Sequence, residues 1–243
     1  FVDCIYVSMR TEQGISDQAV YVILGYDLNG GKDVLGLWIG DTESKHRWMQ
    51  VFDEIKSRGV QDIGFISMDG VSGLEDGAKA IFKNVVVQRC IVHLIRNSLK
   101  YVPSKDYKAF TSQLKKIYGA INLKGAQAEF ERFCDTWNKY PGAIRVWKDN
   151  FRHVEQLFNY GSDVRRVMYT TNAIESVNSS FRKVTKQGAF SSETAIFKVF
   201  YLRIKELYQK WRGHSIRNWA MVMNQLVIDE RIGTMVQKYQ ASI

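Results

Sequence analysis

The stretch Ala19-Val-Tyr-Val-Ile-Leu-Gly-Tyr26, with Asp27-Leu-Asn-Gly-Gly-Lys-Asp33 and Val34-Leu-Gly-Leu-Trp-Ile39 after it, decides how this chain begins to fold. Both apolar runs are rich in β-branched and aromatic residues, which favour strands. The Asn-Gly-Gly between them is typical of a tight hairpin turn, because such turns need positive φ values that glycine adopts easily. The stretch therefore predicts two antiparallel strands of one sheet.

Runs on either side of this hairpin extend the sheet. Val2–Ser8 predicts a third antiparallel strand, and Ile63–Met68 predicts a buried strand that follows a helix and runs parallel to an earlier strand. The predicted elements after the hairpin are helix Ser44–Ser57, strand Ile63–Met68, helix Leu74–Phe82, strand Val85–Val87 and helix Cys90–Val102. Three strands are thus followed by alternating helices and strands.

Beyond Pro103 the pattern predicts helices only. The apolar stripes consist of Tyr107, Phe110, Leu114 and Ile117; of Ala126, Phe130, Phe133 and Trp137; and of Trp147, Phe151, Val154 and Phe158. Aromatic stripes at helical spacing are typical of a packed core, so we interpret this region as an α-helical insertion and not as a cofactor site. Two more helices are predicted at Ser192–Trp211 and Ile216–Tyr239.

The segment Tyr169–Lys186, between the insertion and these last helices, predicts an amphipathic helix. Its apolar face consists of Ile174, Val177, Phe181 and Val184, at positions i, i+3, i+7 and i+10. The other face carries Glu175, with Arg182 and Lys186 two and three turns later. A single carboxylate followed by cationic side chains indicates a site for a metal ion and a phosphate group.

Glu175 also has a purely structural interpretation. Asn172-x-x-Glu175 fits a capping box, in which the glutamate only accepts a hydrogen bond from a backbone N–H at the helix start. The segment alone leaves both interpretations open.

Composition limits the class of protein. A chain of 243 residues, 45% of them hydrophobic, can bury one sizeable core with an inserted subdomain. No run of about 18 apolar residues and no signal-peptide pattern occurs, so we expect a soluble intracellular protein. Cys4, Cys90 and Cys134 are too few and too scattered for a disulfide framework, which fits a reducing compartment. Because Phe1 directly precedes a predicted strand, we expect a domain of a longer protein.

The charge is unevenly distributed along the chain. Residues 1–90 hold 9 Lys and Arg against 13 Asp and Glu, a net charge of −4, whereas residues 91–243 hold 25 against 12, a net charge of +13. Together with a pI near 9.4, this imbalance favours a polyanionic partner.

Two acids stand at the predicted sheet. Three hairpin strands followed by helix, strand, helix and strand is the order of the ribonuclease H-like fold, in which the first and fourth strands lie side by side. Asp3 on the first strand and Asp69 after the fourth should therefore meet. Facing carboxylates repel unless cations lie between them, and Mg²⁺ is held by few protein oxygens with water and phosphate as further ligands. We expect an α/β fold with a mixed five-stranded sheet, helices on its faces and an all-helical insertion before Glu175.

Four segments resemble the transposases of bacterial insertion sequences in the Mutator-like superfamily. They are Phe1-Val-Asp3-Cys-Ile-Tyr-Val7, Ser67-Met-Asp69-Gly70, Cys90-Ile-Val-His93-Leu-Ile-Arg-Asn97 and Thr170-Thr-Asn-Ala-Ile-Glu175-Ser-Val-Asn-Ser-Ser-Phe-Arg-Lys183. The resemblance covers essentially the whole chain in the right order, and the segment around Glu175 is its most specific part.

The resemblance implies a site and a reaction. Asp3, Asp69 and Glu175 would be the catalytic DDE triad and would hold two Mg²⁺ ions, for which Mn²⁺ can substitute. Cys90 and His93 would be the Cys-x-x-His signature of the family, near the active site. The reaction would be Mg²⁺-dependent endonuclease cleavage at transposon ends and transfer of the freed 3′-OH into target DNA, without a covalent protein–DNA intermediate.

The resemblance also implies partners, a location and a division of the chain. The partners would be transposon ends and target DNA, on which a homodimer or larger assembly forms, with no membrane. The location would be the bacterial cytoplasm, in association with the nucleoid. The predicted domains are residues 1–102 and 169–212 as two parts of the core, residues 103–168 as the helical insertion, and residues 213–243 as a C-terminal helical tail.

Two rival functions remain beside transposition. One is a ribonuclease H-like nuclease that only hydrolyses DNA, and the other is a domesticated DNA-binding regulator without catalysis. A complete acidic triad disfavours the regulator, which has no chemical need for three acids.

Two further groups of residues have alternative interpretations. Cys90 and His93 could form half of a zinc site completed by Cys134 and His153, although these residues lack the usual ligand spacing and we favour packing near the active site. The basic cluster Arg182, Lys183 and Lys186 either forms a solvated helix face or contacts the DNA backbone; its closeness to Glu175 favours DNA.

Overall fold

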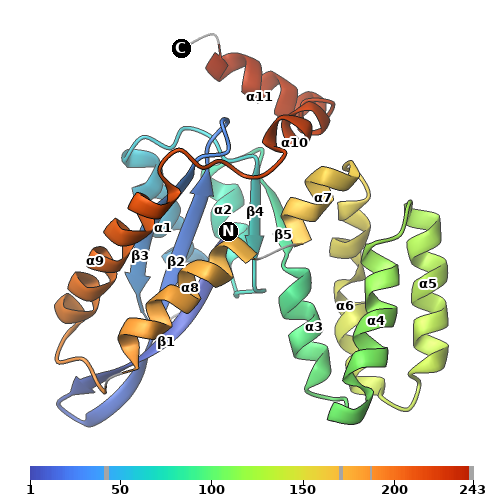
Figure 1. Ribbon diagram of the computed structural model, residues 1–243, viewed down its shortest axis with the longest axis horizontal. Coiled ribbons are helices and arrows are strands. Elements are labelled where there is room, and N and C mark those ends of the chain that lie inside the picture. The colour runs from blue at the N-terminus through green and yellow to red at the C-terminus, as the bar shows by residue number, and fades with distance from the viewer. Residues whose placement is uncertain (41–43, 170–171, 187, 241–243) are drawn as a thin grey trace. The chain divides into compact units, whose positions relative to one another are not determined.

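The computed structural model describes residues 1–40, 44–169, 172–186 and 188–240. By compactness the chain divides into two units (Figure 1). The sheet unit consists of residues 1–87 and 171–243, and the helical unit consists of residues 88–170. The functional domain boundaries predicted from the sequence stay predictions.

The sheet unit contains a mixed five-stranded sheet with the order β3-β2-β1-β4-β5. Its strands are β1 Val2–Thr11, β2 Gly14–Tyr26, β3 Lys32–Ile39, β4 Phe65–Met68 and β5 Val86–Arg89. β1, β2 and β3 are antiparallel neighbours, as the hairpin signal predicted, whereas β4 pairs with β1 in parallel. This order, with helices on both faces, confirms the predicted ribonuclease H-like arrangement.

Each face of the sheet packs against its own pair of helices (Figure 1). One pair is α1 Lys45–Ser57 and α2 Leu74–Ile81; the other is α8 Asn172–Thr185 and α9 Glu193–Trp211. Side chains alternate along β1, so that Val2 packs on the α1 side and Ile5 and Val7 pack on the α8 side. The position of a residue in β1 therefore determines which face of the sheet its side chain lies on.

The turn from β4 to α2 needs a glycine. Gly73 has φ +72°, and a Cβ there would lie 2.2 Å from the backbone nitrogen of Lys45, the first residue of α1. The loop after Asp69 therefore passes close to the start of α1, where a side chain would collide.

The C-terminal region departs from the predicted single helix Ile216–Tyr239. Two helices are present instead, α10 Trp219–Leu226 and α11 Glu230–Gln240. The break has a local cause, because the carboxylate of Asp229 accepts the backbone N–H of Ile232 at 3.2 Å and thereby caps α11.

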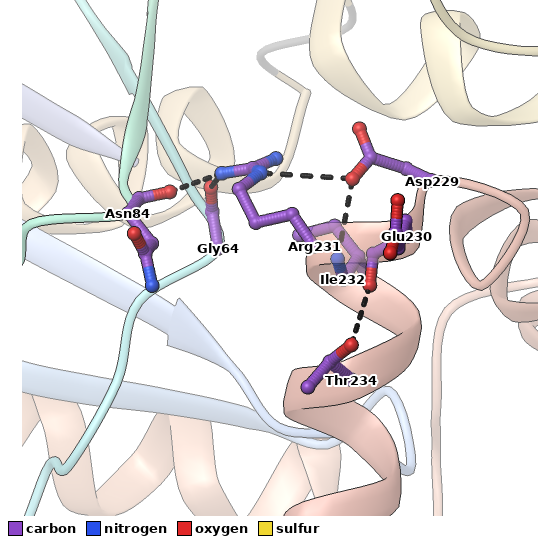
Figure 2. A network of polar contacts seen from close by, with 7 residues as sticks. All are labelled: Gly64, Asn84, Asp229, Glu230, Arg231, Ile232 and Thr234. Atoms are coloured by element: carbon purple, nitrogen blue, oxygen red, sulfur yellow. Dashed lines mark hydrogen bonds and ion pairs between the residues drawn. The ribbon is translucent and has the colours of Figure 1, made fainter.

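Both C-terminal helices attach to the sheet unit. In α10, the indole of Trp219 donates to the carbonyl of Leu28 in the β2–β3 turn at 2.8 Å. In α11, Arg231 donates to the carbonyls of Gly64 and Asn84, which flank β4 and β5 (Figure 2). The chain after α9 is thus fixed at the strand ends by hydrogen bonds to backbone carbonyls.

The helical unit is an α-helical bundle with an aromatic core. Its helices are α3 Ile91–Leu99, the 3₁₀ turn Ser104–Asp106, α4 Tyr107–Tyr118, α5 Leu123–Thr136, α6 Pro141–Leu157 and α7 Ser162–Tyr169. The rings of Phe110 and Phe133 meet edge to face with centroids 5.0 Å apart, and Phe130 stacks on Phe151 at 4.3 Å. The predicted stripes thus form the core, while Tyr107 is more than one-third exposed and α7 was not predicted.

Candidate active site

Asp3 and Asp69 follow paired positions on neighbouring strands. Val2 and Met68 are partners in the parallel pairing of β1 with β4, and an aspartate follows each of them: Asp3 within β1 and Asp69 directly after the end of β4. Asp3 shares its side of β1 with Ile5, and Ser67 lies opposite Met68 in the alternation of β4. Asp69 itself lies in a bend directly after β4 and is half-buried. The predicted adjacency of the first and fourth strands is confirmed.

The carboxylate of Asp3 is buried, with 7% of the residue exposed. Its Oδ1 accepts the backbone N–H of Cys4 at 2.9 Å, and its Oδ2 accepts Nδ2 of Asn178 at 2.5 Å. A buried charge is costly unless it is hydrogen-bonded, and hydrogen bonds to a charged group are the stronger kind. Asn178 is itself fully buried, so this contact joins α8 to β1 away from water.

Packing fixes the rotation of α8 about its axis. Ile174, Val177 and Phe181 are at most 2% exposed and pack against the side of the sheet that carries Ile5. The ring of Phe181 stacks on Phe200 of α9, with centroids 4.4 Å apart. The apolar face predicted for this helix is confirmed, although Val184 is only half-buried.

Glu175 lies three residues before Asn178, so the two side chains are neighbours on the surface of α8. Glu175 is half-buried, whereas Arg182, Lys183 and Lys186 are exposed. The competing capping box depends on the side chain of Asn172. Of this residue the structure describes only the backbone, and Thr170 and Thr171 lie outside the described residues. The capping and catalytic interpretations of Glu175 thus both stay predictions.

Strand pairing and the Asn178 contact bring the elements of the predicted triad together, but they do not form a closed ligand cluster. In residues 1–40, 44–169, 172–186 and 188–240, no group of three or more His, Cys, Asp or Glu side chains is arranged to hold a metal ion. The metal-binding roles of Asp3, Asp69 and Glu175 remain predictions.

Asn178 is the residue that the sequence analysis missed. A signal for it exists, because Asn178 directly follows the apolar position Val177 and lies one turn after Glu175. A polar side chain at the edge of a buried stripe needs a polar partner across the interface. Here that partner is the buried carboxylate of Asp3.

Residues 1–214 match the model of the family described as "Transposase, Mutator family". The chain belongs to this family. It is 38% identical over 231 residues to a probable transposase for an ISRM3-like insertion sequence element of Sinorhizobium fredii, and 37% identical over 231 residues to the transposase for insertion sequence element ISRM3 of Rhizobium meliloti. Both matches cover 94% of this chain and 58% of the relative, so the chain spans little more than half of either protein.

A third relative is covered more fully. A probable transposase for an insertion sequence element of Corynebacterium diphtheriae is 36% identical over 249 residues, which is 94% of this chain and 73% of that protein. The resemblance noted in the sequence is therefore confirmed at the level of the Mutator family.

The Cys-x-x-His segment singled out in the sequence, from Cys90 to His93, lies in the helical unit. Cys90 is buried directly before α3, and the half-buried His93 has its Nε2 3.4 Å from Nη1 of Arg96. The predicted position of Cys90 and His93 near the acidic residues stays a prediction.

The zinc alternative finds no support in the described residues, where these side chains form no metal-binding group with Cys134 and His153. Burial raises the pKa of the Cys134 thiol above its usual value. His153 instead contributes its backbone carbonyl, which accepts Nε2 of the buried Gln88 at 2.7 Å.

Within the part of the chain that the structure describes, none of the helices combines the length and the apolar character needed to cross a membrane.

Replacing Asn178 tests whether it holds Asp3. Asn178→Ala removes a hydrogen bond to a buried charge, which should lower the free energy of unfolding by about 1.5–3 kcal/mol in urea denaturation. Ser179→Ala, at the next and exposed position of α8, is the matched control and should change stability by less than about 0.5 kcal/mol. Equal stability of the two variants would show that the Asn178 contact does not stabilise Asp3.

Proposed function

We propose that this chain carries the catalytic centre of a DNA transposase, which cleaves DNA at transposon ends and joins the freed 3′-OH to target DNA with Mg²⁺. The observation that carries the proposal is the pairing of Val2 with Met68, because it brings the start of β1, with Asp3, beside the end of β4, which Asp69 follows. Membership in the Mutator family supports the substrate, since the relatives named above are transposases of insertion sequences.

The residues fit a hard divalent cation. Asp3 presents two carboxylate oxygens, and the hydrogen bonds from Cys4 and Asn178 hold them in place. Oxygen ligands of this kind suit Mg²⁺ and Mn²⁺, and Asp69 and the half-buried Glu175 offer the same chemistry. We assign Asp3, Asp69 and Glu175 as the ligands of two such ions. When bound, the ions would activate the attacking oxygen and stabilise the leaving 3′ oxygen.

The contribution of the protein would be to position the carboxylates that hold the ions. Asn178 holds the Asp3 carboxylate in one orientation, and the apolar face of α8 keeps Glu175 on the side of the helix next to Asn178. Prior positioning of this kind lowers the cost of aligning the reacting groups. Joining two transposon ends to one target requires two such centres, so we propose a homodimer or larger assembly on DNA.

Replacing Glu175 separates the capping interpretation from the catalytic one. Glu175→Gln retains the side-chain size and an oxygen that can accept a backbone N–H, so a capping role would cost at most about 1 kcal/mol. A neutral amide is a poor Mg²⁺ ligand, so we expect cleavage and joining both to collapse while the melting temperature hardly changes. The control is Glu193→Gln, the same substitution at an exposed position in the first turn of α9, which should leave joining unchanged.

The assay uses the full-length protein to which this chain belongs. This chain spans 58% of its rhizobial relatives, and the remaining part of such a protein can contribute to DNA binding. A pre-cut transposon end with a free 3′-OH is offered with a separate target duplex in Mg²⁺ or Mn²⁺. Efficient joining by Glu175→Gln would exclude Glu175 as a metal ligand. Cleavage without any joining by the unaltered protein would favour a hydrolytic nuclease.

We also propose that Arg182, Lys183 and Lys186 contact the DNA backbone beside the site. All three are exposed and lie outside the buried stripe of α8, so replacing them by Ala should preserve the fold. Binding to all DNA sequences should weaken about equally, and the log–log salt dependence should fall by roughly 0.9 for each lost phosphate contact. An unchanged salt dependence would make the three residues an ordinary solvated face.

A further inference from the structure

The helical unit carries almost all of the net charge of the chain. Residues 88–170 hold 15 Lys and Arg against 7 Asp and Glu, a net charge of +8. The sheet unit holds 19 against 18, a net charge of +1, although it is nearly twice as long. The sheet unit is nearly neutral because the net charge of −5 on residues 1–87 offsets the +6 on residues 171–243. The net basic unit is therefore the one that contains none of the three predicted catalytic acids.

Within the helical unit, the positive charge concentrates on the first helices. Residues 88–128 contain eight Lys and Arg and one acid, Asp106. That acid is already engaged, since it accepts the hydroxyl of Tyr140 at 2.5 Å and Nζ of Lys139 at 3.1 Å. These hydrogen bonds hold the pKa of Asp106 below its usual range, so it stays an anion paired with Lys139.

Helix α4 presents this charge to solvent. Phe110, Leu114 and Ile117 are fully buried and fix the inward face of the helix. The sequence of α4 contains no acid, and Lys108, Lys115 and Lys116 are exposed. In the described part of the chain, none of these three lysines takes part in an ion pair.

Helices α5 and α6 of the same unit carry charges of both signs. On α5, Arg132 lies 2.9 Å from Glu129, and on α6, Arg145 lies 3.5 Å from Asp149. Pairs at this helical spacing stabilise a helix slightly. Helix α4 has no acidic residue with which its lysines could form such pairs, so its charges are all positive. A surface with a single sign of charge is typical of one that attracts a polyanion.

The spacing of the lysines suits the DNA backbone. Lys108 and Lys115 are seven residues apart, which is about 10.5 Å along a helix at 1.5 Å per residue. Phosphates of one DNA strand follow each other at about 3.4 Å along the duplex axis, so this distance corresponds to about three phosphates. Between the lysines, the exposed Ser112 adds a hydroxyl. Residues 108–116, all of them described, expose no large hydrophobic side chain that could anchor a protein or a membrane, although Tyr107 just before them is 39% exposed.

We propose that the outward side of α4, formed by Lys108, Lys115 and Lys116, is a second DNA-binding surface, which holds the phosphate backbone of duplex DNA without reading its sequence. The proposal rests on the proposed function, because transposition makes DNA the partner. It assigns the helical unit a role in DNA affinity that is separate from the chemistry at Asp3, Asp69 and Glu175.

The test compares two triple variants of the protein that contains this chain. The test variant is Lys108→Ala, Lys115→Ala and Lys116→Ala; the control is Lys124→Ala, Arg132→Ala and Arg145→Ala, on α5 and α6 of the same unit. Both variants remove three positive charges at exposed positions, and Ala favours helix, so both should fold as judged by circular dichroism. Binding to a duplex of random sequence is measured between about 50 and 200 mM salt.

We expect the α4 variant to lower the log–log salt slope by roughly 2–3, or about 0.9 for each lost phosphate contact, and the control to leave it nearly unchanged. Equal changes in the two variants would reduce the effect to overall charge and overturn the proposal. An unchanged slope in the α4 variant would overturn it as well.

The joining assay separates this proposal from the proposed function. If the α4 variant binds DNA normally while Glu175→Gln abolishes joining, the second surface is wrong and the catalytic assignment stands. If the α4 variant loses its salt-dependent binding while Glu175→Gln joins DNA efficiently, the surface stands and the catalytic assignment is wrong.

Discussion

The buried carboxylate of Asp3 is the constraint on which the rest of the sheet unit depends. A charge with so little exposure would destabilise the fold unless donors surround it. The chain supplies one donor from its own backbone at Cys4 and another from Asn178 of a helix 175 residues later. This second donor fixes where α8 lies on the sheet, so a local electrostatic requirement links the first strand to a distant part of the chain.

The order of the strands determines where the three predicted catalytic acids lie. Because β1 is central, with β2 on one side and β4 on the other, its residues are covered by helices on both faces. The parallel partner β4 ends beside the start of β1, where Val2 pairs with Met68, and an aspartate follows each of these two residues. The apolar stripe of α8 packs against the sheet, and Glu175 lies half-buried at the edge of that stripe. The two units then differ in character, since the one with the acids is nearly neutral and the helical one is strongly basic.

Much of this fold could be predicted from the sequence because its signals are local. The Asn-Gly-Gly turn predicted the β2–β3 hairpin, and the stripes around Phe110 and Phe133 predicted a helical core. The order of elements also predicted that β1 and β4 are neighbours.

The errors arose where a distant or subtle contact decides the structure. The capping carboxylate of Asp229 divides the last predicted helix in two, although the apolar pattern continues through the break. Asn178 was missed because its partner lies 175 positions away, and a sequence pattern records only neighbours. The predicted position of Cys90 and His93 near the acids stays a prediction, since these two residues belong to the other compact unit.

Anomalous diffraction from a crystal soaked in Mn²⁺ tests the central claim most directly, because it locates the metal without reference to activity. The account predicts manganese bound to carboxylate oxygens of both Asp3 and Asp69 at about 2.1 Å, close to the distance for Mg²⁺. Asn178 should still donate to Asp3 in that crystal. Manganese bound elsewhere on the protein, with none at Asp3 and Asp69, would contradict the assignment of these residues as the catalytic metal ligands.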